Sequence, residues 1–263
     1  MKLTRALLVL VAVCTTARAD QLTDRCKDLG CIRERIQRQM QQEKVPALSV
    51  AVTRKGEFLW EESFGFADLA TRVPATKDTM YSLASITKPM TATAVMALVR
   101  DGKVDLDRPI DDYLGQAKLT ARMGDAKEAT VRRVLNHTSG LPVHAHFFYA
   151  DETERRPSMD LTIQRYANLI RPPAERYQYS NLGYGLLDFV VSRVSGRSYA
   201  DFMQQQVFAP LGMKHSVVAD AHTVGATRYD VDGTPVPYYD FDHPGASAVF
   251  ASAGDVARFG MFH

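Results

Sequence analysis

Hydrophobic and polar residues follow two different periods along the chain, and each period predicts a different kind of element. Residues 47–53 and 57–64 have the composition of strands, and Lys55-Gly56 between them is typical of a turn. The later hydrophobic residues mostly recur at helical spacing. The predicted helices are residues 31–42, 85–100, 130–135, 159–170, 182–194 and 199–207, with a last one starting at 252–255. We therefore expect a β-hairpin followed by a mostly helical block.

The first nineteen residues have the pattern of a secretory signal peptide. Lys2 and Arg5 precede the apolar run 6–13, and a short stretch ending at Ala19 supplies the small residues of a cleavage site. The apolar run is far shorter than the roughly 20 residues that span a bilayer. We expect cleavage after Ala19, no stable membrane insertion afterwards, and a mature protein of residues 20–263 in the periplasm or the medium.

Composition limits the classes of function. The 263 residues are 46% hydrophobic and 24% charged, which suits one globular domain or two lobes around a cleft. Removing the first nineteen residues removes three basic side chains, so the formal net charge changes from +2 to −1. A chain of this charge without basic clusters is not expected to bind nucleic acid.

Two cysteines remain after cleavage. Cys26 and Cys31 flank Gly30, which could form a tight turn, and an exported protein meets an oxidising environment. The sequence leaves two alternatives, a short-range disulfide or two free thiols. Lipid attachment at Cys14 is the weaker alternative to a cleaved signal, because Val13 stands where a small residue is usual.

The candidate chemistry starts at Ser85-Ile86-Thr87-Lys88-Pro89. Proline is tolerated in the first turn of a helix, so we expect the helix to begin near Ser85. Residues three apart on a helix share one face, so the Lys88 amine can reach the Ser85 hydroxyl and, when neutral, take its proton. A chain of this length contains about one Ser-x-x-Lys by chance, so the motif needs support from elsewhere.

Tyr-x-Asn, which would supply a proton donor and an amide, occurs twice. Tyr166-Ala167-Asn168 falls in a predicted helix, where residues two apart face different sides, so we interpret it as structural. Tyr179-Ser180-Asn181 falls in a predicted loop, where Tyr179 and Asn181 can project to the same side. The alternative for this copy is an aromatic anchor and a helix cap.

With these motifs, the chain resembles the serine β-lactamase and penicillin-recognising hydrolase family, on its class C side. The stretches that carry the resemblance are Val45–Val52, Ser82–Pro89, Gly102–Asp107, Leu135–Pro142 and Tyr179–Tyr184. The resemblance implies an α/β (α+β) fold of the β-lactamase/transpeptidase type, with an antiparallel sheet flanked by helices and a helical lobe.

The resemblance also implies roles for individual residues. Ser85 would be the acylated nucleophile, Lys88 its base, Tyr179 the proton relay to the leaving group, and Asn181 the group that binds the substrate amide. His137 would belong to a structural turn and stay outside the site. The substrate would be a small molecule or peptide: a β-lactam, a D-Ala-D-Ala peptide, a D-amino amide or a short ester.

One motif of this family is not found in the chain. A Lys or His followed by Thr or Ser and Gly is expected beyond the second motif, and His215-Ser216-Val217 lacks the glycine. We therefore expect residues 20–263 to be a domain incomplete at its C-terminus, lacking its last strands and one oxyanion-hole donor. The alternative function is a non-catalytic or acylation-only module that binds penicillin or peptidoglycan.

Two other polar groups are set aside. His144-Ala145-His146 has no third ligand at suitable spacing, so we expect no metal and no cofactor. Asp240, Asp242 and His243 form a cluster that lines the cleft or makes a solvated turn.

Overall fold

The computed structural model describes residues 26–220, 223 and 225–263. The predicted signal peptide and Cys14 lie outside these described residues. The described residues divide into two compact units at Val45/Pro46, and the candidate chemistry belongs to the second, residues 46–263.

The described part of the first unit contains the helix α2 (Leu29–Gln42). Asp28 caps its start, because the side-chain carboxylate accepts a hydrogen bond of 2.9 Å from the Cys31 backbone N–H. Cys26 and Cys31 form a disulfide. The helix predicted for residues 31–42 is confirmed and begins two residues earlier.

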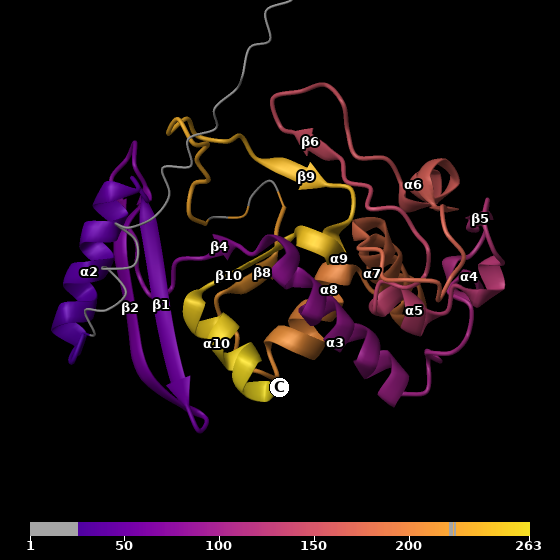
Figure 1. The fold of residues 1–263 in the computed structure, drawn as a ribbon, viewed down its shortest axis with the longest axis horizontal. Coiled ribbons are helices and arrows are strands. Elements are labelled where there is room, and N and C mark those ends of the chain that lie inside the picture. Colours follow the sequence, from indigo (N-terminus) through magenta and orange to yellow (C-terminus); the bar gives the residue numbers. More distant parts are fainter. Residues whose placement is uncertain (1–25, 221–222, 224) are drawn as a thin grey trace, which may run out of the picture. The chain divides into compact units, whose positions relative to one another are not determined.

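The second unit opens with the predicted hairpin. Strands β1 (Ala47–Arg54) and β2 (Glu57–Asp68) pair antiparallel, with Ala47 opposite Gly65 and Val50 opposite Glu62. β2 runs on to Asp68 and pairs with the short strand β3 (Val73–Pro74). The helix α10 (Ala253–Phe262) packs against β1 (Figure 1), so the end of the described chain returns to the hairpin.

A second sheet is built from strands of two or three residues. β10 (Val249–Ala251) lies between β4 (Tyr81–Ser82) and β8 (Ser216–Val218), and both pairings are antiparallel. The sequence pattern did not reveal these strands, because three residues are too few for an alternating pattern to stand out. β10 is buried along its whole length, which makes this sheet part of the core.

Two further pairs of short strands connect distant segments. β5 (Thr120–Ala121) pairs parallel with β7 (Asn168–Leu169), and β6 (Phe147–Tyr149) pairs antiparallel with β9 (Tyr239–Phe241). The helix predicted for residues 159–170 is therefore too long. It ends at Tyr166, because Asn168 and Leu169 turn their backbone groups to β5.

The helical block is organised around two long helices. The remaining helices are α3 (Thr87–Arg100), α4 (Asp111–Leu114), α5 (Val131–Leu135), α6 (Met159–Tyr166), α7 (Asn181–Ser195), α8 (Tyr199–Met203) with a π-helical turn Gln204–Phe208, and α9 (Pro244–Ser247). α3 packs against α7, and both contact α9. Their facing side chains are fully buried, among them Met90 and Ala94 of α3 and Leu182 and Leu186 of α7. The helices of the described residues are all too short or too polar to span a bilayer.

This mixture of helices with antiparallel sheets confirms the α+β architecture expected from the sequence. In Figure 1, α9 and β10 lie beside the start of α3, so residues near 245 and near 87 are neighbours. That proximity forms the candidate site.

Candidate active site

Ser85 lies in a 3₁₀ turn, Ala84–Ile86, that leads directly into α3. Pro89 is the third residue of α3, as the sequence predicted. Ala84 has a φ of 47°, in the left-handed region that residues with a side chain rarely adopt. Such strain persists where surrounding contacts enforce it, often beside a functional group. Ser85 is exposed and Lys88 is buried, so a ligand can reach the hydroxyl but not the amine.

The Lys88 amine has three oxygen partners. Its Nζ lies 3.0 Å from Ser85 Oγ, 2.9 Å from Asn181 Oδ1 and 3.0 Å from the carbonyl oxygen of Ala246. The oxygens of Asn181 and Ala246 can only accept hydrogen bonds. When the amine is neutral, its two N–H groups therefore go to these oxygens, and its lone pair faces Ser85 Oγ.

The protonation of Lys88 is set mainly by its surroundings. Burial lowers the pKa of Lys88 from its ordinary value of 10.5, while the nearby Tyr179 opposes part of that change. A lower pKa increases the fraction of neutral amine near pH 7, which is the form that can accept a proton.

Tyr179 approaches Ser85 from the other side. Its hydroxyl donates a hydrogen bond of 2.7 Å to Ser85 Oγ, and the Lys88 Nζ lies 4.7 Å from the centre of the Tyr179 ring. Tyr179 precedes Ser180, the N-cap of α7, whose hydroxyl accepts a hydrogen bond of 2.9 Å from the Gly183 N–H. The start of α7 therefore positions both Tyr179 and Asn181.

The loop after α5 holds this segment in place. The Ser180 hydroxyl donates to the Pro142 carbonyl at 2.6 Å, and the Asn181 N–H donates to the Val143 carbonyl at 2.9 Å. All four residues expected in the site, Ser85, Lys88, Tyr179 and Asn181, are thus linked by hydrogen bonds. They come from two segments more than ninety residues apart.

His137 lies beside Tyr179 and Ser180. Its ring centre is 4.6 Å from that of Tyr179, and its Nδ1 accepts a hydrogen bond of 3.1 Å from the Ser180 N–H. His137 therefore contacts the segment that carries Tyr179, and no hydrogen bond joins it to Ser85 among the described residues. The family resemblance implied that His137 belongs to a structural turn outside the site. In the sequence, only its position in the turn 136–142 indicated that it would lie near the site.

The pH dependence of stability tests this environment of His137. Burial, aided by the charge on Lys88, lowers the pKa of His137 to about 4. The unfolded chain then binds a proton more readily than the folded one, so stability falls as the pH decreases from about 6.5 to about 4. His137→Asn, which keeps an acceptor for Ser180, should remove up to about 1.4 kcal/mol per pH unit of that slope in urea unfolding.

Part of the slope should remain in this variant, because burial also lowers the pKa of His243 to about 4. Equal slopes for the wild type and His137→Asn between pH 6.5 and 4 would contradict the prediction.

Nothing in the sequence indicated that the Ala246 carbonyl would contact Lys88. The Ala246 carbonyl comes from α9. One further contact anchors α9 to α3, and a second anchors the strand β10 that follows it. The Thr91 hydroxyl donates to the Gly245 carbonyl at 2.7 Å, and the Val249 N–H donates to the Thr87 hydroxyl at 3.1 Å. A main-chain carbonyl carries no residue-specific pattern, so only the fold reveals it.

The other copy of the Tyr-x-Asn motif lies elsewhere. Tyr166 is the last residue of α6 and stacks on the His144 ring, with 4.0 Å between ring centres. Asn168, in β7, accepts a hydrogen bond of 2.8 Å from Arg122. The placement of both residues in one helix was wrong, but neither is hydrogen-bonded to Ser85.

The polar cluster near residue 242 is buried. Asp242 is 4% exposed and His243 is not exposed at all, so a solvated turn is wrong for these two residues. Asp240 and Asp242 line a cavity of about 520 Å³ beside α7 and β9. The lining of this cavity comes from other residues than Ser85, Lys88, Tyr179 and Asn181.

Comparisons with known proteins indicate the same family as the sequence motifs. The family model described as Beta-lactamase matches residues 32–262. Penicillin-binding protein 4* of Bacillus subtilis (strain 168) is 30% identical over 175 residues, which are 65% of this chain and 37% of that protein. Protein flp of Staphylococcus aureus (strain MW2) is 26% identical, over 76% of this chain and 41% of that protein.

Solved structures extend the likeness over most of the chain. The octameric penicillin-binding protein homologue from Pyrococcus abyssi has a TM-score of 0.72 and 28% identity, covering 89% of this chain and 56% of that one. A class C β-lactamase has a TM-score of 0.71 and 25% identity, covering 88% and 62%. A β-lactamase/D-alanine carboxypeptidase from Pseudomonas syringae has a TM-score of 0.72 and 25% identity, covering 88% and 64%.

The protein belongs to the β-lactamase family and has the β-lactamase/transpeptidase-like fold. The resemblance drawn from the sequence motifs is therefore confirmed. The chain spans about two fifths of the curated relatives and about three fifths of the solved chains named above.

Proposed function

We propose that this protein is an exported serine hydrolase that acts through an acyl-enzyme on Ser85. One observation carries the proposal: Ser85 Oγ lies within hydrogen-bonding distance of both the Lys88 amine, at 3.0 Å, and the Tyr179 hydroxyl, at 2.7 Å. A serine hydroxyl needs a nearby base to become a nucleophile, and the departing group needs a proton donor. This pair of contacts could supply both.

In the proposed reaction, neutral Lys88 takes the proton of the Ser85 hydroxyl while Oγ attacks the substrate carbonyl carbon. The bond to the leaving group breaks, and Tyr179 relays the proton held by Lys88 to the leaving atom, which returns Lys88 to its neutral form. Water then attacks the acyl-enzyme and releases the acid, which restores the Ser85 hydroxyl. Asn181 Oδ1 accepts a hydrogen bond from Lys88. The NH₂ group of the Asn181 side chain would therefore donate to a substrate amide carbonyl.

The names of the relatives support a substrate of the β-lactam or D-alanyl peptide kind. Relatives named as penicillin-binding proteins and β-lactamases match the chain, and one structure is named as a β-lactamase/D-alanine carboxypeptidase. Short esters and D-amino amides also present a carbonyl beside a polar handle. The signal-like first nineteen residues support a periplasmic or secreted location, where such substrates are found.

The second candidate is an acylation-only or non-catalytic module. It is favoured by the name of one relative, penicillin-binding protein 4*, which states binding and not hydrolysis. In this candidate Ser85 reacts with a β-lactam but the acyl group is not released, or Ser85 does not react.

Intact-mass measurement after incubation with a penicillin and with a fluorophosphonate separates the candidates. We expect both reagents to add to the wild type and neither to add to Ser85→Ala. A penicillin adduct that disappears with time supports a hydrolase, and one that persists supports the acylation-only module. If neither reagent adds to the folded wild type, or if Ser85→Ala is labelled equally, the proposed role of Ser85 is wrong.

A further inference from the structure

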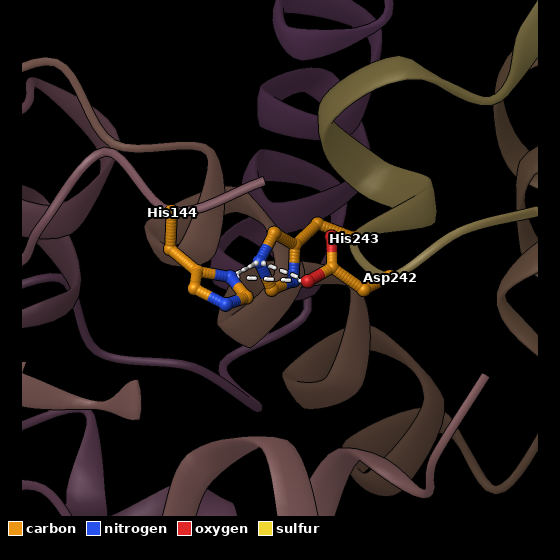
Figure 2. Close-up of side chains that lie close together, drawn as sticks. All are labelled: His144, Asp242 and His243. Atoms are coloured by element: carbon orange, nitrogen blue, oxygen red, sulfur yellow. Dashed lines mark hydrogen bonds and ion pairs between the residues drawn. The ribbon is translucent and has the colours of Figure 1, made fainter. Parts of the chain in front are cut away.

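Three side chains set aside during sequence analysis converge outside the Ser85 group. Figure 2 shows His144, Asp242 and His243 pointing their polar atoms toward one another. His144 Nδ1 lies 2.9 Å from His243 Nε2 and 3.0 Å from Asp242 Oδ2, and His243 Nε2 lies 3.2 Å from the same oxygen. The pairing of β6 with β9, with Phe147 opposite Phe241, brings together residues about a hundred positions apart.

With Asp242 ionised, hydrogen bonds alone cannot satisfy all three of these contacts. A ring nitrogen carries at most one hydrogen, and an ionised carboxylate carries none. If the His144 nitrogen donates to His243, the lone pairs of His243 and Asp242 face each other at 3.2 Å. If both ring nitrogens donate to Asp242, two N–H groups face each other at 2.9 Å. A cation between the three atoms would make every contact attractive.

We propose that His144, Asp242 and His243 bind a divalent transition-metal ion of the zinc type. Two imidazole nitrogens and one carboxylate oxygen are the donors that zinc takes, whereas calcium and magnesium prefer oxygen alone. Zinc at about 2.0–2.1 Å from each donor in a tetrahedron places neighbouring donors about 3.3 Å apart. The three observed separations are shorter by only a few tenths of an ångström.

The surrounding contacts hold the donors in this arrangement. The His146 backbone N–H donates to Asp242 Oδ1 at 3.1 Å, which leaves Oδ2 directed at the two rings. The Tyr166 ring stacks on His144. The side chains of His144, Asp242 and His243 are 16%, 2% and 0% exposed, so a bound ion is shielded from water except on the His144 side.

His243 can use only one of its nitrogens toward this cluster. Its Nδ1 is buried without a hydrogen-bond partner among the described residues. That side of the ring packs so closely against Gly185 of α7 that a Cβ there would collide with it. The polar contacts of the ring are therefore made through Nε2, the atom that faces His144 and Asp242.

The proposed ion would join two segments that also hold the Ser85 group. Val143, next to His144, accepts the backbone hydrogen bond of Asn181, and Ala246, three residues after His243, accepts a hydrogen bond from Lys88. The ion would thereby fix the loop 142–144 relative to α9. Metal binding does not depend on whether Ser85 reacts, so the two proposals fail separately.

Titration of the full chain with cobalt(II) and zinc, after treatment with a chelator, tests the site directly. We expect one equivalent of cobalt(II) to produce visible absorption of a tetrahedral type, which zinc then displaces. His144→Ala and Asp242→Asn should each weaken zinc binding by about 100-fold or more, since even partners of the ligands are worth 10–100-fold. Circular dichroism establishes that each variant is folded.

His146→Ala is the matched control. Its side chain is 41% exposed and lies 3.8 Å from Glu154 rather than in the cluster, so this variant should bind zinc like the wild type. Zinc at a hundred times its Kd should raise the Tm of the wild type by about 5–10 °C, and magnesium should not. A folded wild type without cobalt absorption, or equal zinc affinity in His144→Ala, would overturn the proposal.

Discussion

Replacing Lys88 by methionine is expected to slow acylation of Ser85 by about 10²–10⁴-fold, the usual contribution of a positioned base. Methionine has a similar length and suits the buried position but cannot accept the Ser85 proton. It also leaves the oxygens of Asn181 and Ala246, both partners of the Lys88 amine, without that donor. We therefore expect a modest loss of thermal stability together with the large loss of reactivity. The rate of fluorophosphonate labelling measures the first, and a melting curve the second.

Two further variants show whether the loss of reactivity comes from losing the base at Lys88. Lys103→Met makes the same change at an exposed lysine and should label at the wild-type rate. Lys88→Arg keeps the positive charge, but arginine stays protonated in proteins and cannot act as a base. It should therefore be as slow as Lys88→Met. An arginine variant that labels at the wild-type rate would show that Lys88 acts through its charge and not as a base.

Replacing Gly245 by alanine is expected to destabilise the fold. A Cβ at this position of α9 would lie 2.7 Å from the Tyr184 backbone carbonyl oxygen and 2.7 Å from the Asp188 Cβ. The backbone of α7 cannot move aside as a flexible side chain would, so α9 must shift. Overpacking of this kind costs about 1–3 kcal/mol. The shift would also move the Ala246 carbonyl, which accepts from Lys88, so the labelling rate should fall as well.

Gly260→Ala provides the matched control for this prediction. Gly260 lies in α10. Apart from its chain neighbours and the nearby backbone of α10, no heavy atom of the described residues lies within 4 Å of the position its Cβ would take. Alanine inside a helix is more favourable than glycine by about 0.5–1 kcal/mol, so this variant should be slightly more stable than the wild type. If Gly245→Ala is as stable as Gly260→Ala, as measured by urea unfolding, the close packing of α9 on α7 is contradicted.

Patterns that lie within one segment of sequence could be interpreted without the structure. The hairpin of β1 and β2 has two long strands and a Lys55-Gly56 turn, and α3 and α7 are long enough for helical spacing to be clear. Ser85 with Lys88, and Tyr179 with Asn181, are likewise local pairs. Their meeting at one hydroxyl could be expected from the family resemblance but not from spacing.

Features that depend on distant backbone could not be predicted in this way. The strands β8, β9 and β10 have three residues each, and their pairing is set by the surrounding core. The Ala246 carbonyl reaches Lys88 only because α9 packs on α3. His144 was dismissed because its sequence neighbours offered no further ligand, while the structure places Asp242 and His243 beside it.

The central claim is that Lys88 activates the Ser85 hydroxyl for attack on a carbonyl or a reagent that mimics it, with Tyr179 as the proton donor to the leaving group. Peptide mapping of fluorophosphonate-labelled protein, with the labelling rate followed against pH, tests it most directly. The account predicts a single adduct on Ser85 whose rate rises with pH as Lys88 loses its proton, and no such rise in Lys88→Met. An adduct on another residue, or the same pH-dependent rate in Lys88→Met, would contradict it.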